Sequence, residues 1–156
     1  MAALIQFFLT GGAGNADPNA SLGGTRSATQ VSGTAMNNLF DDVSPAEATA
    51  GDVEYRAIDL YNAGDAEAQA VTVHTDPDTP SPKTEIDLGL EAGTQTVPDE
   101  NTAPSGVAFA HHTPGAMLSV PNIAAGSAQR LWLRRTVQAG AVNLNNDATA
   151  IKVQYA

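Results

Sequence analysis

The sequence contains no cysteine. A disulfide framework, a thiolate nucleophile and a cysteine-ligated metal site are therefore excluded, and the protein does not need an oxidising compartment. Positive charge is also scarce, because seven lysines and arginines stand against seventeen aspartates and glutamates, for a formal net charge of −10. Proteins bind the nucleic-acid backbone through lysine and arginine, which displace counterions from the phosphates. The sequence therefore predicts that nucleic acid is not a partner.

Long apolar runs are absent as well. The run from Ala2 to Leu9 is too short to span a bilayer, and no basic residue precedes it as in a signal peptide. We expect this run to form a β-strand in a protein that is made in the cytoplasm and has no membrane partner. The 156 residues match the size of one ordinary domain with a single core.

Sequence patterns of several common enzyme classes are also missing. Gly12 and Gly14 begin a dinucleotide-binding pattern, but Asp17 stands where the third glycine would be, and the chain has no Gly-Lys-Ser/Thr after it. Neither the Gly-x-Ser-x-Gly nucleophile elbow nor the His-Glu-x-x-His zinc motif occurs in the chain. These absences favour a protein that is not an enzyme and binds no cofactor.

The chain does contain the patterning of β-strands. From Asp52 to Thr75, apolar residues alternate with polar ones on both sides of the break Asn62-Ala63-Gly64-Asp65. This pattern predicts two half-buried strands joined by a hairpin or by a sheet-to-sheet corner. Between Ala57 and Ile58 the inward-facing apolar positions shift by one residue relative to the alternation before them, so we expect a β-bulge there.

The rest of the chain predicts further short strands and no long helix. The strand patterns cover residues 25–31, 86–90, 105–110, 129–137 and 149–155. The stretch from Val43 to Gly51 predicts a single helical turn or an irregular connector, and Asp76 to Pro82 predicts a turn-rich loop. About seven or eight short strands of this kind predict an all-β fold, an antiparallel β-sandwich.

The N-terminal region differs in composition from the rest of the chain. Residues 11–24 are rich in glycine and short polar side chains, which bury little and cannot hold a helix. We therefore expect a glycine-rich N-terminal strand and arm over residues 1–38, structured only against a neighbour, and a folded domain over residues 39–156. Such an arm predicts a homo-oligomer or a protein bound to a larger assembly.

Charge is unevenly distributed along the chain. Fifteen of the seventeen acidic residues lie between Asp41 and Glu100, whereas four of the seven basic residues lie near the C-terminus. Those four are Arg130, Arg134, Arg135 and Lys152. Surfaces of opposite sign would favour docking to a second copy or to a basic partner. The alternative is an acidic surface that keeps the protein soluble.

Candidate metal ligands are few. His74 precedes Asp76 and Asp78, which together offer nitrogen and oxygen ligands, but the prolines among them disfavour a converging site. Two adjacent acid pairs could bind calcium, although neighbouring residues of a strand point to opposite faces. These pairs are Asp41-Asp42 and Asp99-Glu100, and the pair His111-His112 is expected to be an exposed part of a loop. We therefore expect no metal site.

Five residues are candidates for a protein interface. Trp132, flanked by Arg130 and Arg134, has the composition of an interface anchor, because tryptophan buries a large area and guanidinium groups bind carboxylates. Phe7 and Phe8 of the N-terminal strand are the other two candidates. The alternative is that both faces of the strand carrying Trp132 are covered, so that this side chain belongs to the core.

Seven short segments carry a resemblance to a known family. They are Leu39-Phe40-Asp41-Asp42-Val43, Gly51 to Arg56, Asn62-x-Gly64, Ile86-x-Leu88-Gly89-Leu90, Pro104-Ser105-Gly106-Val107-x-Phe109, Ile123-Ala124-Ala125-Gly126 and Trp132-x-Arg134-Arg135-Thr136-Val137. In this order they resemble small structural proteins encoded by tailed bacteriophages. The Asn-x-Gly turn and the later Ala-Gly-Ser turn also resemble those of immunoglobulin-like adhesion modules.

The resemblance implies an immunoglobulin-like β-sandwich that is a component of a virion. It implies a non-enzymatic capsid decoration protein, assembled in the host cytoplasm, that binds the outer surface of the head, with the major capsid protein as its partner. The alternative is a carbohydrate- or receptor-binding module of a tail or fibre, which would use Trp132 or the loop from Asp76 to Pro82.

Overall fold

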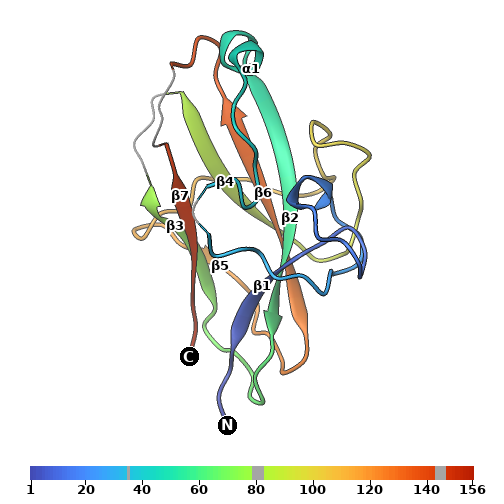
Figure 1. The fold of residues 1–156 in the computed structure, drawn as a ribbon. Helices are drawn as coiled ribbons and strands as arrows, with labels where there is room; N and C mark the ends of the chain where they lie inside the picture. The colour runs from blue at the N-terminus through green and yellow to red at the C-terminus, as the bar shows by residue number, and fades with distance from the viewer. Residues whose placement is uncertain (35, 79–82, 143–146) are drawn as a thin grey trace.

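Two antiparallel sheets pack face to face (Figure 1), so the prediction of an all-β sandwich is confirmed. The computed structural model describes residues 1–34, 36–78, 83–142 and 147–156. One sheet has four strands in the order β1-β2-β6-β4, and the other has three in the order β5-β3-β7. The strands are β1 (Ile5–Leu9), β2 (Asp52–Asn62), β3 (Thr72–Asp78), β4 (Thr84–Glu91), β5 (Leu118–Ser119), β6 (Ala128–Val137) and β7 (Thr149–Gln154).

The chain crosses from one sheet to the other after β2. The break at Asn62 is therefore a sheet-to-sheet corner, one of the two predicted geometries. The Asn62 side chain holds this corner, since its Oδ1 accepts hydrogen bonds from the N–H groups of Leu4 (3.1 Å) and Gly64 (3.0 Å) and its Nδ2 donates to the Ile123 carbonyl (2.9 Å). A Cβ on Gly64 would lie 2.2 Å from the carbonyl oxygen of Ala2, so the corner requires glycine at this position.

Strand β2 keeps an uninterrupted register with β6, and the predicted bulge between Ala57 and Ile58 is therefore wrong. Ala57 lies opposite Trp132 and Ile58 lies opposite Leu131, on the two opposite faces of the sheet. Both faces are buried here, so apolar residues occupy successive positions without any slip of the strand.

Apolar side chains form one cluster on each face of the four-stranded sheet. The main core lies between the two sheets, and its buried residues are Ile5, Leu9, Leu39, Ile58, Leu60, Ala68, Val71, Val73, Leu88, Val120, Ile123, Leu131 and Leu133. The outer cluster lies on the other face, and its buried residues are Tyr55, Ala57, Val97 and Trp132. Loop residues such as Leu22 and Val107 pack against the outer cluster. Full burial of each large apolar side chain contributes about 1.5–3 kcal/mol to folding.

Of the two structures predicted before β2, the helical turn is the one observed, as helix α1 (Pro45–Ala50). The Ser44 Oγ accepts the N–H of Glu47 (3.3 Å), and the Glu47 carboxylate accepts the N–H of Ser44 (2.7 Å), which is a reciprocal capping box. Gly51 ends the helix at a φ of +82°, a conformation that favours glycine. Among the described residues, no helix is both long and apolar enough to cross a membrane.

Residues 1–34 pack on the sandwich instead of extending from it, which corrects the prediction of an arm structured only against a neighbour. β1 is an edge strand of the four-stranded sheet, antiparallel to β2. Beyond β1, the buried hydroxyl groups of Thr10 and Ser21 both donate hydrogen bonds to the Ala57 carbonyl, at 3.1 Å and 2.6 Å. The glycine-rich region therefore folds onto its own chain and covers part of the outer face.

The two weaker predicted strands contribute isolated bridges. Residues 25–31 bridge β1 through Gln30, and residues 105–110 bridge β4 through Ala110. The loop predicted from Asp76 begins later than expected, because β3 continues to Asp78 with an irregular register, and residues 79–82 lie outside the described residues.

Candidate functional site

The arginines of β6 lie opposite acidic residues on both neighbouring strands. Three cross-strand ion pairs result, and they are Arg130–Asp59, Arg134–Asp87 and Arg135–Glu54. Arg130 and Arg135 are buried, and Arg134 is partly exposed. Paired residues directly opposite one another stabilise a sheet and neutralise each other's charge. The basic residues near the C-terminus therefore do not form the basic surface that the sequence suggested.

Trp132 is fully buried in the outer cluster. Both faces of β6 are therefore covered at this position, which is the core alternative stated for this side chain and not the interface one. It lies between Ala57 of β2 and Gly89 of β4. A Cβ on Gly89 would lie 2.5 Å from Cγ1 of Val107, so the covering loop approaches the strand closely at this point. The indole Nε1 donates a hydrogen bond of 2.6 Å to Oε2 of Glu91. In this chain Trp132 therefore presents no surface to a partner.

The other four predicted interface residues differ in exposure. Arg130 is buried, whereas the side chain of Arg134 is 33% exposed. Phe8 is buried and packs edge-to-face with Tyr61, with 5.7 Å between the ring centres. Phe7 is half-buried against the main core. Of the five predicted residues, Arg134 and Phe7 retain appreciable accessible surface.

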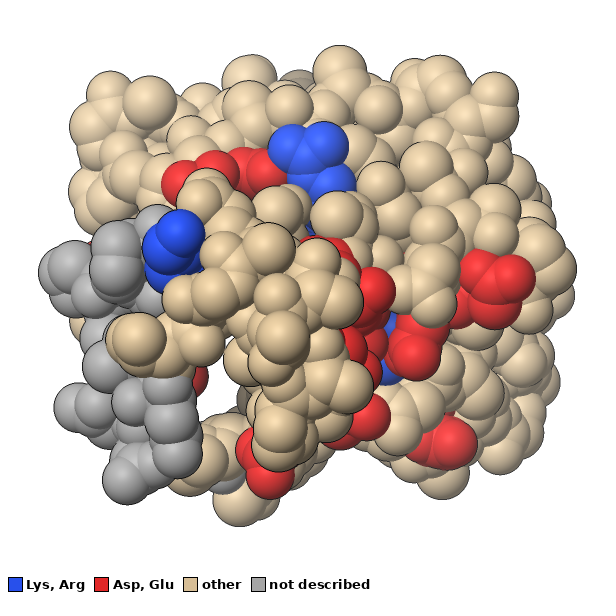
Figure 2. All heavy atoms as spheres, turned by 90° about the horizontal axis from the view of Figure 1, so that it is seen from above, with Lys and Arg blue, Asp and Glu red and all other residues tan. Residues whose placement is uncertain are grey.

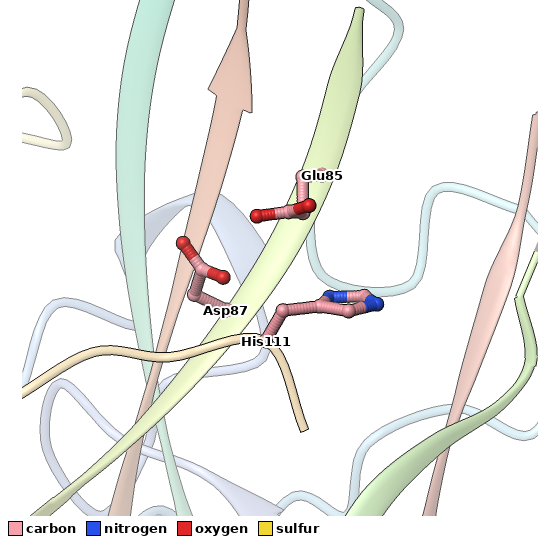
Figure 3. A group of neighbouring side chains, drawn as sticks. All are labelled: Glu85, Asp87 and His111. Carbon is pink, nitrogen blue, oxygen red and sulfur yellow. The ribbon is translucent and has the colours of Figure 1, made fainter. Parts of the chain in front are cut away.

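A cluster of titratable side chains lies on the edge strand β4 (Figure 3). Glu85 and Asp87 share one face of β4, because residues two apart in a strand point the same way. His111 approaches them from the loop that comes after the bridge at Ala110. The ligand-type atoms of these three side chains all lie within 4.8 Å of one another. We refer to Glu85, Asp87 and His111 as the Glu85 cluster.

Neighbouring charges act on this cluster. Arg134 donates two hydrogen bonds to Oδ2 of Asp87, at 3.0 Å from Nε and 2.5 Å from Nη2. Nε2 of His111 lies 3.1 Å from Oδ2 of Asp78. Burial raises the pKa of Glu85, and the charge and hydrogen bond of Asp87 raise it further. Glu85 is therefore easier to protonate than an ordinary glutamate.

The cluster is capable of proton sharing and of cation binding. Nδ1 of His111 lies 3.0 Å from the Ile86 carbonyl oxygen, so this nitrogen is held as a donor and Nε2 faces Asp78. An imidazole nitrogen and carboxylate oxygens suit a divalent transition metal. However, Arg134 already supplies positive charge to Asp87. The hydrogen bond from His111 to the Ile86 carbonyl therefore links the loop to β4, and its contact with Asp78 links the same loop to β3.

The Glu85 cluster is not among the sites predicted from the sequence. The spacing of Glu85 and Asp87 on an alternating strand indicates that they share a face, and this signal was available. His111 was expected to be an exposed loop residue. It meets the two acids because the bridge between Leu88 and Ala110 brings its loop beside β4, and this pairing leaves no local pattern in the sequence.

The metal ligands considered from the sequence do not converge. His74 is buried, Asp76 pairs with Lys152 at 2.7 Å, and Asp78 faces His111. These contacts draw the two aspartates to different partners, and among the described residues no cluster of metal-ligand side chains includes His74.

One residue of each adjacent acid pair forms an ion pair with an arginine of the four-stranded sheet. Asp41 Oδ1 lies 3.3 Å from Nη2 of Arg135, and Glu100 Oε2 lies 2.6 Å from Nη2 of Arg56. Arg56 is fully buried, and its Nε also donates to the Leu39 carbonyl at 3.0 Å. These acids therefore attach the covering segments to the four-stranded sheet.

A cleft of about 1240 Å³ opens between the sheets at the end of the molecule that carries α1. Ile86 and Leu133 of the four-stranded sheet line one side, and Ile151 of β7 lines the other. Met36 and Val142 also line it, and each exposes 65% of its surface. Figure 2 shows this end of the molecule, with a hollow and several acidic side chains gathered near it. We refer to this feature as the α1-end cleft.

No family model, no curated protein and no solved structure matches this chain. Its function is therefore inferred from its own residues and from their arrangement.

Proposed function

We propose that this protein is a non-enzymatic structural component of a tailed-bacteriophage virion, namely a capsid decoration protein that binds the major capsid protein on the outer surface of the head. The observation that carries the proposal is the surface around the α1-end cleft, where Met36 and Val142 are exposed. Exposed apolar residues that gather around a cleft mark interaction sites, whereas scattered ones do not. Such a surface fits a protein that functions by docking to a larger assembly.

The segments that resemble phage structural proteins support this proposal, because their residues build the scaffold. Asn62 holds the sheet-to-sheet corner, and Gly126, at a φ of +73°, donates its N–H to the Asn62 carbonyl at 2.9 Å. The ring of Phe40 lies 5.2 Å from the guanidinium of Arg56 and 5.1 Å from that of Arg135. These roles are structural, as expected for a protein that is not an enzyme.

The proposal includes an immunoglobulin-like fold and a homo-oligomeric state on the particle. The first is supported by two antiparallel sheets joined through a corner between β2 and β3. The second is supported by the exposed apolar N-terminal residues Met1 and Leu4, which lie beside the edge strand β1.

The tail or fibre alternative receives less support. That alternative uses Trp132 as a contact with the ligand, and Trp132 is fully buried. The other element of that alternative was the loop from Asp76 to Pro82, of which residues 76–78 belong to β3 and residues 79–82 lie outside the described residues. We therefore favour docking to the head.

Cosedimentation of the purified full chain with undecorated capsids tests the proposal. We expect the protein to pellet with capsids and to stay in the supernatant without them, because binding to the shell carries it down. Capsids that already hold their decoration protein are the control, and they should recruit little of the added chain. A protein that ignores undecorated capsids and binds a glycan in an array would contradict the proposal and favour the tail or fibre alternative.

A further inference from the structure

We propose that the α1-end cleft binds an extended segment of a partner protein, which alternates apolar with polar residues, carries lysine or arginine, and pairs with the outer edge of β7. This inference rests on the proposed function, because it names the chemistry of the partner at the docking surface. Four features of the molecule support it: the opening of the sandwich, the edge of β7, the acidic lining and the exposed apolar residues.

The sandwich is closed at one end and open at the other. Near the N-terminus, the N–H of Ile5 donates to the hydroxyl oxygen of Tyr155 at 3.3 Å, which joins β1 to the end of the chain beyond β7. At the α1 end, the cleft of about 1240 Å³ lies between the same two sheets. Protein interiors are normally packed without such space. The volume exceeds the roughly 300–1,000 Å³ typical of small-molecule pockets, and it suits several side chains of a peptide.

Strand β7 offers backbone groups for an added strand. It is the last strand of the three-stranded sheet, and among the described residues its ladder runs to β3 on one side. Residues 149–151 of β7 line the cleft. Along β7, half-buried residues alternate with exposed ones. A segment that pairs with this edge would gain backbone hydrogen bonds and direct every second side chain into the cleft.

The lining of the cleft is acidic. Its acidic residues are Asp41, Asp42, Asp78, Glu85 and Asp147. Among the described lining residues the basic one is Arg135, which is already paired with Glu54. Complementary charge selects partners and speeds their encounter. The excess of carboxylates therefore favours an occupant that carries lysine or arginine.

A second copy of this chain fits the cleft poorly. The chain has a net charge of −10, and five of its seven basic residues form ion pairs with acids of the same chain. Copies therefore have little positive charge to offer and repel one another at this surface. A small apolar molecule would use neither the carboxylates nor the edge of β7. These considerations leave a basic, extended segment of a different protein as the occupant.

Selection of short random peptides against the immobilised full chain tests the inference. We expect the enriched peptides to alternate apolar with polar residues and to carry net positive charge. A synthetic copy of the most enriched peptide should bind in fluorescence anisotropy, and more weakly at high salt. It should also slow hydrogen exchange of amides in residues 149–153, because an added strand protects them.

Exposed residues of the cleft allow variants that leave the core unchanged. Asp42→Lys and Val142→Ser should each weaken binding of the synthetic peptide about tenfold, which corresponds to about 1.4 kcal/mol. Glu67→Lys is the matched control, because Glu67 is an exposed acid on the connection between β2 and β3, at the other end of the sandwich. It makes the same charge change as Asp42→Lys and should leave binding within about twofold.

Several results would overturn the inference. They are the absence of any enrichment, the enrichment of acidic peptides, and equal binding by the Asp42→Lys and Glu67→Lys variants. Displacement of the peptide by a fluorescent fatty acid would reassign the cleft to a small ligand, and self-association lost in Val142→Ser would reassign it to a second copy. A chain that pellets with capsids but fails these tests would leave the proposed function standing. A chain that binds basic peptides through the cleft but ignores capsids would contradict the virion proposal alone.

Discussion

Replacement of Trp132 separates a core role from an interface role. The side chain is fully buried, and it is fixed between Ala57 and Gly89 with its indole N–H on Glu91. Truncation of a buried tryptophan to alanine costs about 3–5 kcal/mol. A domain of this kind has a total stability of about 5–15 kcal/mol. We therefore expect Trp132→Ala to lose about 3–5 kcal/mol of its free energy of unfolding. If the parent protein lies near the lower end of the range of stabilities, this loss leaves the variant largely unfolded at room temperature.

Trp132→Phe tests the indole hydrogen bond with less loss of volume. Oε2 of Glu91 then loses its donor at 2.6 Å, while Oε1 keeps the N–H of Gln95 at 2.8 Å. A buried acceptor left without its partner costs about 1–3 kcal/mol. Because the two groups interact directly, the free-energy changes of Trp132→Phe and Glu91→Gln should fail to add, by about 0.5 kcal/mol or more in a double-mutant cycle.

Urea unfolding followed by far-ultraviolet circular dichroism measures these changes in all variants, since the Trp132 variants lack the single tryptophan as a fluorescent probe. Thr136→Ala is the matched control, because Thr136 is half-buried on the same face of β6. It should change the free energy of unfolding by about 0.5 kcal/mol or less. A Trp132→Ala variant that kept the stability of the parent protein, yet no longer bound capsids, would refute the core assignment.

Three further predictions concern charge and the N-terminal region. Arg130→Met leaves Asp59 as a buried, unpaired charge and removes the cation 4.0 Å from Oε2 of Glu91, so it should cost about 3–5 kcal/mol, part of which Arg130→Met with Asp59→Leu should restore in urea unfolding. The raised pKa of Glu85 in the folded protein means that its contribution to stability is complete below its unfolded pKa and is lost as pH rises through the folded pKa. Glu85→Gln should therefore raise the melting temperature at neutral pH and leave it unchanged below about pH 4, and because Glu85 is exposed the gain should stay under about 1 kcal/mol. Deletion of residues 1–38 removes β1 and the hydroxyl groups bonded to Ala57, so it should abolish cooperative thermal unfolding, and a shortened chain that still melted cooperatively would show that this region is dispensable.

The strands that the sequence predicts well are those in which apolar residues alternate with polar or small ones, including β4, where Asp87 and Gly89 are buried as well. Residues 86–90 and 149–155 alternate clearly, and they correspond to β4 and β7 within a few residues. The pattern Ser44-Pro45 likewise predicts the start of α1. β2 and β6 are buried on both faces, so apolar residues occur at successive positions along them. The apparent phase slip at Ala57 and the face occupied by Trp132 are consequences of that double burial, which alternation alone does not reveal.

The candidate sites depend on pairing between distant residues. Arg130 meets Asp59 across 71 positions of the chain, and no local pattern predicts that contact. The glycine-rich region was interpreted as an arm because it has few apolar residues. It is held instead by buried hydroxyl groups, such as those of Thr10 and Ser21. Composition does not distinguish a polar segment that hydrogen-bonds to the sheet from one that extends into solvent.

The cross-strand ion pairs of β6 also bear on how the chain reaches its fold. A shift of β6 by one position along β2 would place Arg130 opposite Ile58 or Leu60 and turn its guanidinium to the other face of the sheet. An unpaired guanidinium buried among apolar side chains costs several kcal/mol. Misaligned sheets therefore lie well above the native one in free energy. Pairing of strands that are far apart in the chain is slow and open to error, and in this protein the arginines confine it to a single alignment.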